Sequence, residues 1–447
     1  MSKSAACPWT KLTDVKSVEI GPLVAPVNIE VALPGSKSVS NRVLLMAALA
    51  DAPCRLSGVL RSDDTYWMTE SLKTLGANIA IDGSNFSIWG NNLLASRSPT
   101  RIFVGSSGTA ARFLPGVLAA RQAETIMAGS EQLTKRPIAS LVEGLKSLGA
   151  AIETMGEGER LPLKISGGGF DGGQIAMSGA QSSQFISGVL IAAPLSRQGV
   201  TLEVPDEIVQ SDYVRITLHY MKAFGVVSET NNDLTRFFVP PQQYRAANFP
   251  LEADASTATY FFALAALTGG RTKIANLGTT TTQPDYGFVD ILERMGCRVV
   301  KTETTTEVVG GHPLKGGFDI DMKPLSDATL TLAAIAPFAD GPIHIHNVAH
   351  IRHHESDRIK VACDILTGMG LRVEERPDGL SIYPGNPRKT EIDPRDDHRV
   401  AMSMALTGAK GNGIVIDTPS CVSKTCPEFF DLLSACAGVS VTPKMAS

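Results

Sequence analysis

The 447-residue chain has few cysteines, few aromatic residues and no strong excess of either charge. Its seven cysteines contain no C-x-x-C pair, which argues against a disulfide framework or a cysteine zinc site and favours a reducing compartment. Lys and Arg total 41 against 45 Asp and Glu, so no broad basic surface for nucleic acid or membrane is expected. Apolar runs such as 330–339 are too short to span a bilayer, and the first 20 residues lack a signal-peptide core. These absences predict a cytoplasmic protein without a nucleic-acid or membrane partner.

The chain contains a degenerate internal repeat. An apolar helix face ends at a glycine and is followed by a strand-like run, as in SLKTLGANIAI and ILERMGCRVVK. Glycine directly after the last apolar position is the expected left-handed helix cap. These glycines recur at intervals of 68 to 76 residues, at Gly76, Gly149, Gly225, Gly296, Gly370 and Gly438.

A second phase of the repeat lies about 40 residues before each glycine, where a polar start leads into an Ala- and Leu-rich stretch. The markers of this phase are Lys37, Gly108, Ser183, Ser256, Asp327 and Asp397. The two phases agree and predict six copies of one α/β unit of roughly 73 residues. The proline-rich stretch 240–250 falls between copies three and four, so we expect two similar lobes with a binding cleft between them.

The predicted helix starts carry residues suited to anions. Backbone N–H groups and about half a positive charge face outward at a helix N-terminus. Singly, a Ser or Asp here is usually a cap, an Arg a surface charge and a Gly-rich segment a turn. Five cations at equivalent positions would repel by about 4 kcal/mol per pair at 4 Å, so we expect them to persist only with bound anions. They are Lys37, Arg136, Arg358, Arg399 and Lys424.

Five of the eight histidines lie between residues 344 and 354, a composition that invites a metal-site interpretation. His344 and His346 alternate in a strand-like run, whereas the adjacent His353 and His354 would point apart. Arg352 and Arg358 would also repel a divalent cation. We therefore predict no metal.

Eight motifs in order resemble one family over nearly the whole chain, from about residue 31 to 438. They are LPGSKSVSNR, SSGTAAR, KRPI, SSQF, PLSDATLT, IRHHESDR, DDHRVAM and KTCPEFF. The family is 5-enolpyruvylshikimate-3-phosphate synthase. The resemblance implies a two-lobed, inside-out α/β barrel of six repeats, three per lobe, with helix N-termini facing the interlobe cleft. Residues 34–249 would form the N-terminal lobe, and 250–447 with 1–33 the C-terminal lobe.

The resemblance also implies an activity in the shikimate pathway. The enzyme would transfer the enolpyruvyl group of phosphoenolpyruvate to the 5-hydroxyl of shikimate 3-phosphate and release phosphate, as a monomer without metal or organic cofactor. The herbicide glyphosate inhibits this family from the phosphoenolpyruvate site. Asp327 matches the base for the 5-hydroxyl, Glu355 the residue that protonates and later deprotonates the methylene carbon, and Lys37 a further catalytic position.

Binding residues follow from the same motifs. For phosphoenolpyruvate they are Lys37, Gly108, Arg136, Gln184, Arg358, Arg399 and Lys424. For shikimate 3-phosphate they are Lys37, Ser38, Arg42, Ser182, Ser183, Gln184, Ser211, Tyr213, Asp327, His350 and His354.

The sequence departs from the commonest bacterial pattern of the family at a few of these positions. Ser106 replaces an Asn, Phe113 replaces a Pro, and Gln210 stands at a phosphate-binding Ser, although Ser211 is adjacent. His350 and His354 replace an Asn and a Lys. These changes leave the expected reaction class intact and bear on substrate affinity.

Three other functions compete with this interpretation. An enolpyruvyl transferase acting on UDP-N-acetylglucosamine typically carries a reactive Cys in the second copy, and the stretch 121–136 has none. An RNA 3′-phosphate cyclase of related fold would suit a more basic chain. A non-catalytic protein that only binds phosphorylated metabolites remains an alternative on the residues alone.

Overall fold

The computed structural model describes residues 7–10, 12–311 and 313–446, and the chain divides into two compact units. Unit 1 comprises Gly35–Leu251 with Cys7, and unit 2 comprises Pro8–Pro34 and the chain from Glu252 onward. Cys7 donates its N–H to the Asp63 carboxylate at 3.3 Å, which ties it to unit 1. Relative to the predicted lobes, Cys7, Pro250 and Leu251 belong to unit 1 and Pro34 belongs to unit 2, while residues 1–6 lie outside the described residues.

The described part of unit 1 contains three four-stranded sheets. Each has the same pattern, in which one parallel strand pair is followed by two antiparallel pairs. In sheet order they are β14 (Asn248–Pro250), β3 (Cys54–Ser57), β5 (Asn85–Trp89) and β4 (Asn78–Asp82); β6 (Thr100–Phe103), β7 (Thr125–Ala128), β9 (Arg160–Ile165) and β8 (Ile152–Gly156); and β10 (Gly173–Ala176), β11 (Val200–Glu203), β13 (Arg236–Val239) and β12 (Glu229–Thr230).

Among its described residues, unit 2 repeats this pattern in three more four-stranded sheets. In sheet order they are β2 (Asn28–Val31), β15 (Arg271–Ile274), β17 (Thr306–Val309) and β16 (Arg298–Lys301); β18 (Phe318–Asp321), β19 (Ile343–His346), β21 (Gly379–Ile382) and β20 (Val373–Arg376); and β22 (Thr390–Ile392), β23 (Ile414–Asp417), β1 (Val15–Ile20) and β24 (Val441–Met445). The repeated pattern matches the sequence repeat and confirms the predicted α/β class.

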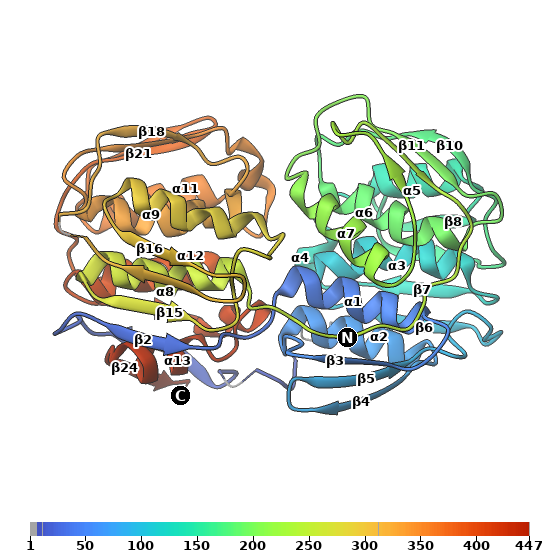
Figure 1. Cartoon of the computed structure of the whole chain (residues 1–447), viewed down its shortest axis with the longest axis horizontal. Helices are drawn as coiled ribbons and strands as arrows, with labels where there is room; N and C mark the ends of the chain where they lie inside the picture. Colours follow the sequence, from blue (N-terminus) through green and yellow to red (C-terminus); the bar gives the residue numbers. More distant parts are fainter. Residues whose placement is uncertain (1–6, 11, 312, 447) are drawn as a thin grey trace. The chain divides into compact units, whose positions relative to one another are not determined.

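Helices accompany the sheets, and within each unit they run between them (Figure 1). In unit 1 they are α1 (Lys37–Leu49), α2 (Asp63–Thr74), α3 (Gly108–Ala120), α4 (Glu131–Thr134), α5 (Ala139–Ser147), α6 (Ser183–Ala192), the 3-10 turn η1 (Ala193–Leu195) and α7 (Asp212–Ala223). In unit 2 they are α8 (Ala255–Thr268), η2 (Pro284–Gly287), α9 (Phe288–Arg294), η3 (Ser326–Ala328), α10 (Thr329–Ile335), η4 (Ala336–Phe338), η5 (Ala349–His353), α11 (Arg358–Gly368), α12 (His398–Lys410), η6 (Pro419–Lys424) and α13 (Phe429–Ala437).

The predicted helix-ending glycines have the conformation that their position requires. All six have positive φ, from 66° at Gly438 to 108° at Gly76, a region that disfavours residues with a Cβ atom. At Gly225 a Cβ atom would also lie 2.7 Å from the Arg245 side chain. The sequence period therefore located the ends of the six helices correctly.

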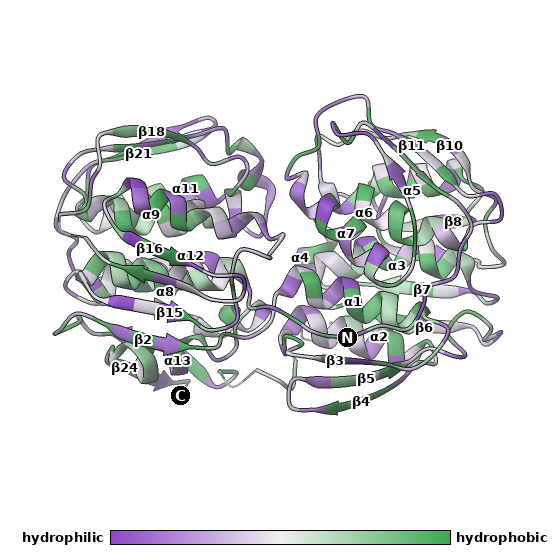
Figure 2. Ribbon diagram, viewed as in Figure 1, coloured by the Kyte–Doolittle hydropathy of each residue, from purple (hydrophilic) through white to green (hydrophobic). Residues whose placement is uncertain are grey.

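The core of each unit is built on helices that are buried all round. Every residue of α8 from Ala255 to Leu267 is buried, and the helix is largely hydrophobic in Figure 2. Its N-cap Asp254 accepts a hydrogen bond from the Thr257 N–H at 2.8 Å. A helix without an exposed face can present polar groups to ligands only at its ends, so the helix starts are where function is expected.

Candidate functional site

Arg358 is the centre of an ionic cluster in unit 2. It begins α11, is 1% exposed, and donates to Asp327 Oδ1, Glu355 Oε2 and Asp397 Oδ2, each at 2.9 Å. Burial alone would lower the pKa of Arg358, but these three carboxylates raise it above its ordinary value. Arg358 is therefore a permanent cation held in a fixed orientation.

Two further cations complete this cluster. Arg399, the second residue of α12, donates from Nη2 to Asp327 Oδ2 at 2.9 Å. Lys424, at the end of η6, places Nζ 3.0 Å from Glu355 Oε1. Asp327 and Glu355 are thus each shared between two cations, one on each carboxylate oxygen.

These ion pairs correct one expectation from the sequence. The cations of unit 2 were expected to persist only with bound anions, yet each has a carboxylate partner within the unit. Asp327 is 72 positions before Arg399 in the sequence, so the order of the residues alone does not reveal this pairing. A substrate anion would therefore have to compete with carboxylates already in place.

Asp397 belongs to this cluster although the sequence indicated only a helix start. Its side chain is 0% exposed, caps α12 by accepting the Arg399 N–H at 3.0 Å, and accepts from Ser356 Oγ at 2.9 Å. It also accepts from Arg358 Nε at 2.9 Å. The sequence feature that points to Asp397 as a site residue is an acid directly before His398 and Arg399 at the start of a buried helix.

Two histidines of the predicted site adjoin the cluster. His354 Nδ1 lies 3.1 Å from Arg358 Nη1, and because arginine can only donate, Nδ1 must be the acceptor. The ring of His350 lies 5.7 Å from that of His354. Burial lowers the pKa of His350 below its ordinary value, and the nearby Asp327 charge offsets only part of that effect. In the described part of the chain no group of three His, Cys, Asp or Glu side chains is placed to hold a metal ion.

Arg42 in unit 1 is a buried cation of a different kind. It is 2% exposed and donates to Thr217 Oγ1 at 2.7 Å, to the Ser38 carbonyl at 2.8 Å and to the Tyr213 carbonyl at 3.0 Å. Its guanidinium lies 4.9 Å from the centre of the Phe113 ring. These partners are all neutral, and burial lowers the pKa of Arg42 to about 10. The structure thus brings together Ser38, Arg42 and Tyr213 and shows Phe113 beneath the guanidinium.

Gly108 and Arg136 also meet within unit 1. A Cβ atom at Gly108, the first residue of α3, would lie only 2.8 Å from Arg136 Nη1. Arg136 itself does not begin a helix as the repeat suggested, because Lys135 closes α4 and α5 begins at Ala139. Beside Gly108, the hydroxyl of Ser106 lies 2.7 Å from that of Ser130.

The remaining predicted residues of unit 1 stand at helix starts. Lys37 begins α1, and Ser182 caps α6 by accepting the Gln184 N–H at 3.2 Å. Ser183, the first residue of α6, is 3% exposed. Ser211 precedes α7 after Gln210, which adopts a left-handed φ of 55°.

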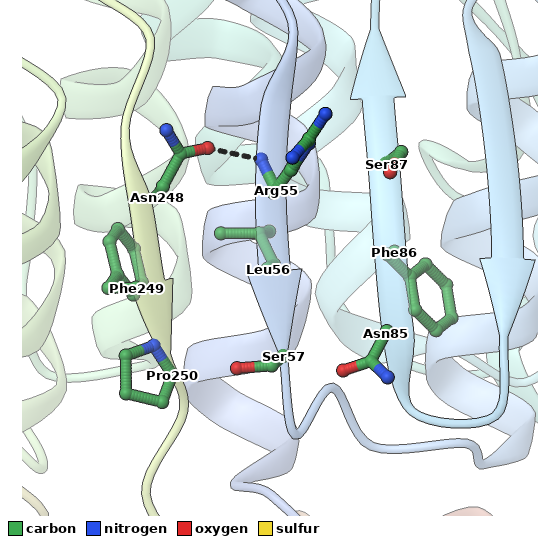
Figure 3. Close-up of a pocket in the computed structure, with 9 residues that line it drawn as sticks. All are labelled: Arg55, Leu56, Ser57, Asn85, Phe86, Ser87, Asn248, Phe249 and Pro250. Carbon is green, nitrogen blue, oxygen red and sulfur yellow. Dashed lines mark hydrogen bonds between the residues drawn. The ribbon is translucent and has the colours of Figure 1, made fainter.

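A separate hollow of about 370 Å³ lies on the sheet that contains β14, β3 and β5 (Figure 3). Asn248 Oδ1 accepts the Arg55 N–H there at 2.6 Å, and the lining includes none of the predicted site residues. The ionic cluster, rather than this hollow, is therefore the candidate site. Within the described chain, no helix has both the length and the apolar character needed to cross a membrane.

Comparisons with known proteins agree on one family. The family model described as EPSP synthase (3-phosphoshikimate 1-carboxyvinyltransferase) matches residues 23–433. The chain is 48% identical to 3-phosphoshikimate 1-carboxyvinyltransferase 2 of Halalkalibacterium halodurans, covering 96% of this chain and 97% of that protein. It is 38% identical to the chloroplastic 3-phosphoshikimate 1-carboxyvinyltransferase of Arabidopsis thaliana, covering 90% and 81%. The solved EPSP synthase of Acinetobacter baumannii has a TM-score of 0.82 at 25% identity, covering 96% of this chain and 100% of that one.

Proposed function

The chain belongs to the EPSP synthase (3-phosphoshikimate 1-carboxyvinyltransferase) family, and from that premise we propose its reaction and the residues that serve it. It transfers the enolpyruvyl group of phosphoenolpyruvate to the 5-hydroxyl of shikimate 3-phosphate and releases phosphate. The observation that carries this proposal is the sharing of Asp327 and Glu355 between cations in one buried cluster. The reaction needs two carboxyl groups and fixed positive charge around a phosphate.

In the addition step the 5-hydroxyl oxygen forms a bond to C2 of phosphoenolpyruvate. Asp327 takes the hydroxyl proton, and Glu355 gives a proton to C3, which becomes a methyl group. In the elimination step Glu355 recovers a proton from that methyl group, the C2–O bond to phosphate breaks, and phosphate leaves with the bonding electron pair. The two carboxyl groups thus divide the acid and base work.

Substrate anions prepare these carboxyl groups for proton transfer. Each oxygen of Glu355 accepts from a cation, an arrangement that favours the ionised form. A bound phosphate or carboxylate competes for Arg358 and Lys424 and weakens those ion pairs. The proton affinity of Glu355 then rises, so that it can become the donor that addition requires.

The other proposed contacts follow the sequence motifs. Arg42 binds shikimate 3-phosphate, because a buried guanidinium with neutral partners favours an anion. The motifs assign Lys37, Gly108 and Arg136 to phosphoenolpyruvate, and they assign Arg358, Arg399 and Lys424 to the same substrate. We propose that the chain acts as a monomer in the cytoplasm.

The test is phosphate release from phosphoenolpyruvate plus shikimate 3-phosphate, with each substrate omitted in turn. We expect release only with both substrates, and formation of the enolpyruvyl ether by mass spectrometry. Release with UDP-N-acetylglucosamine in place of shikimate 3-phosphate would favour the other enolpyruvyl transferase. Tight binding of both substrates without release would favour a non-catalytic binding protein.

A further inference from the structure

Asp285 is a buried acid that the proposed reaction does not use. It lies in η2, directly before α9, and is 3% exposed. Its Oδ2 accepts a hydrogen bond from the hydroxyl of Ser256, the second residue of α8, which is 7% exposed. Burying a carboxyl group is unfavourable unless its interactions compensate, so its contacts need an explanation.

Ser256 links Asp285 to the proposed active site. The same hydroxyl oxygen accepts from Arg399 Nη2 at 3.3 Å, and that nitrogen also donates to Asp327 Oδ2 at 2.9 Å. One guanidinium nitrogen therefore bridges Ser256 and Asp327. From that nitrogen the hydrogen bonds continue from Arg399 to Ser256 and from Ser256 to Asp285.

Capping and charge balance do not account for Asp285. The start of α8 is already capped by Asp254, and Arg399 already has a carboxylate partner in Asp327. The charged groups facing Asp285 are Asp327 from η3, Arg399 from α12 and Asp254 from the start of α8. Burial, with a smaller contribution from Asp327, raises the pKa of Asp285 to about 7, so its charge is costly near neutral pH.

We propose that Asp285 and Ser256 are positioning residues, which hold the Arg399 guanidinium in place and through it orient the carboxylate of Asp327. This inference rests on the proposed function, in which Asp327 accepts the 5-hydroxyl proton. Without the Ser256 contact, Arg399 loses one of its buried hydrogen bonds and holds Asp327 Oδ2 less firmly, while Asp327 Oδ1 stays paired with Arg358. The base would then be present but misdirected, and misplacement of about 1 Å costs roughly 100-fold in rate.

The experiment compares three variants with a matched control. Ser256→Ala removes the link, Asp285→Ala removes the acceptor, and Asp285→Asn keeps an acceptor oxygen without the charge. Thr259→Val is the control, since Thr259 lies one turn further along α8 and is buried. Its hydroxyl contacts the Ser256 carbonyl at 2.6 Å and the Thr331 hydroxyl at 2.9 Å, not the Ser256 side chain. Turnover and KM are measured across pH 6–9, with the melting temperature of each protein.

We expect Ser256→Ala and Asp285→Ala to lower kcat by about 10- to 100-fold while KM for shikimate 3-phosphate changes less than about threefold. Asp285→Asn should retain most of the wild-type kcat. Its kcat profile should lack the inflection near neutral pH that the wild-type profile shows. Thr259→Val should leave kcat unchanged even if it melts earlier. Should Asp285→Ala fail to fold, Ser256→Ala and Asp285→Asn decide the matter.

The two proposals fail in different ways. If Ser256→Ala keeps wild-type kcat, or loses no more activity than Thr259→Val, the positioning role is wrong and the proposed function stands. If Asp285→Asn is as slow as Asp285→Ala with an unaltered pH profile, the positioning role is also overturned. A folded wild type that releases no phosphate from the two substrates overturns both proposals.

Discussion

Arg42 in unit 1 and Arg358 in unit 2 are both buried arginines near the start of a helix, yet their surroundings are opposite. Arg42 is held by carbonyl oxygens, a hydroxyl and an aromatic ring, and its positive charge is not neutralised by these partners. Arg358 is surrounded by three carboxylates. Burial lowers the pKa of the first, whereas the carboxylates raise the pKa of the second.

The comparison shows that one repeated fold can support two kinds of polar site. Helix starts recur at the same position in each copy, but the side chains around them decide the charge. Neutral partners leave a cation whose charge a bound anion can neutralise. Carboxylate partners instead give a cluster that already contains an acid and a base and that a substrate must rearrange.

Glu355→Gln should produce the largest effect, because it removes an ionisable group from the carboxylate-rich cluster. Turnover should fall about 10²- to 10⁴-fold while both substrates still bind. The control is Asp364→Asn on α11, the helix that follows Glu355, where the acid pairs with Lys360 at 3.2 Å on the exposed surface. Steady-state kinetics and calorimetry check this, and near-wild-type turnover of folded Glu355→Gln would remove it from the mechanism.

Arg358→Met should destabilise the protein most, because it leaves three carboxylates without their shared cation. Breaking a buried ion pair costs about 3–5 kcal/mol in the free energy of unfolding, measured by urea denaturation. Arg197→Met is the matched control, since the Arg197–Asp171 pair at 2.6 Å is exposed and should contribute about 1 kcal/mol or less. Equal losses in the two variants would contradict the prediction.

Asp285→Asn should change how stability depends on pH. The folded carboxyl has a pKa raised to about 7, against the ordinary 3.8, so the folded state binds more protons between these values. Wild-type stability should therefore fall, relative to Asp285→Asn, as pH rises from 4 to 7, by at most about 4 kcal/mol. Above pH 7 the difference should be constant. Parallel curves from urea denaturation at pH 4.5, 6 and 8 would disprove the shift.

Arg42→Met should cost binding more than stability, the reverse of Arg358→Met. A charged hydrogen-bonding group contributes about 1.5–3 kcal/mol, so affinity for shikimate 3-phosphate should fall about 10- to 100-fold. Unfolding should change less than in Arg358→Met, because no carboxylate is left unpaired. Titration calorimetry with shikimate 3-phosphate and with inorganic phosphate alone shows how much of the lost affinity belongs to the phosphate group.

Phe113→Leu should have the smallest effect. It removes an aromatic face 4.9 Å from the Arg42 guanidinium, a contact that contributes about 0.5–2 kcal/mol. We expect KM for shikimate 3-phosphate to rise several-fold with kcat nearly constant. The control is Phe185→Leu, since Phe185 is also buried in unit 1. It should lower the free energy of unfolding without changing KM for shikimate 3-phosphate.

The sequence predicted what depends on local chemistry. Glycine spacing located the helix ends, and polar starts located α1, α3 and α6 to the residue. It did not predict contacts across long separations, such as Asp327 with Arg358 or Ser256 with Arg399, which are 31 and 143 positions apart. Those contacts depend on how helices pack, which periodicity does not specify. The same limit explains why the sequence indicated a helix start at Asp397 and not its place in the ionic cluster.

The strand order of the two units has a consequence for synthesis. Unit 1 from Gly35 onward is a continuous stretch of chain that can complete its sheets once Pro250 has been made. Unit 2 cannot, because β1 pairs with β23 and β24, more than 390 positions later. The earliest strand made is thus among the last to find its partners, and it must wait while all of unit 1 is translated. A chain truncated before Ile414 should therefore leave β1 with two unpaired edges, and one truncated between Asp417 and Val441 should leave it with one.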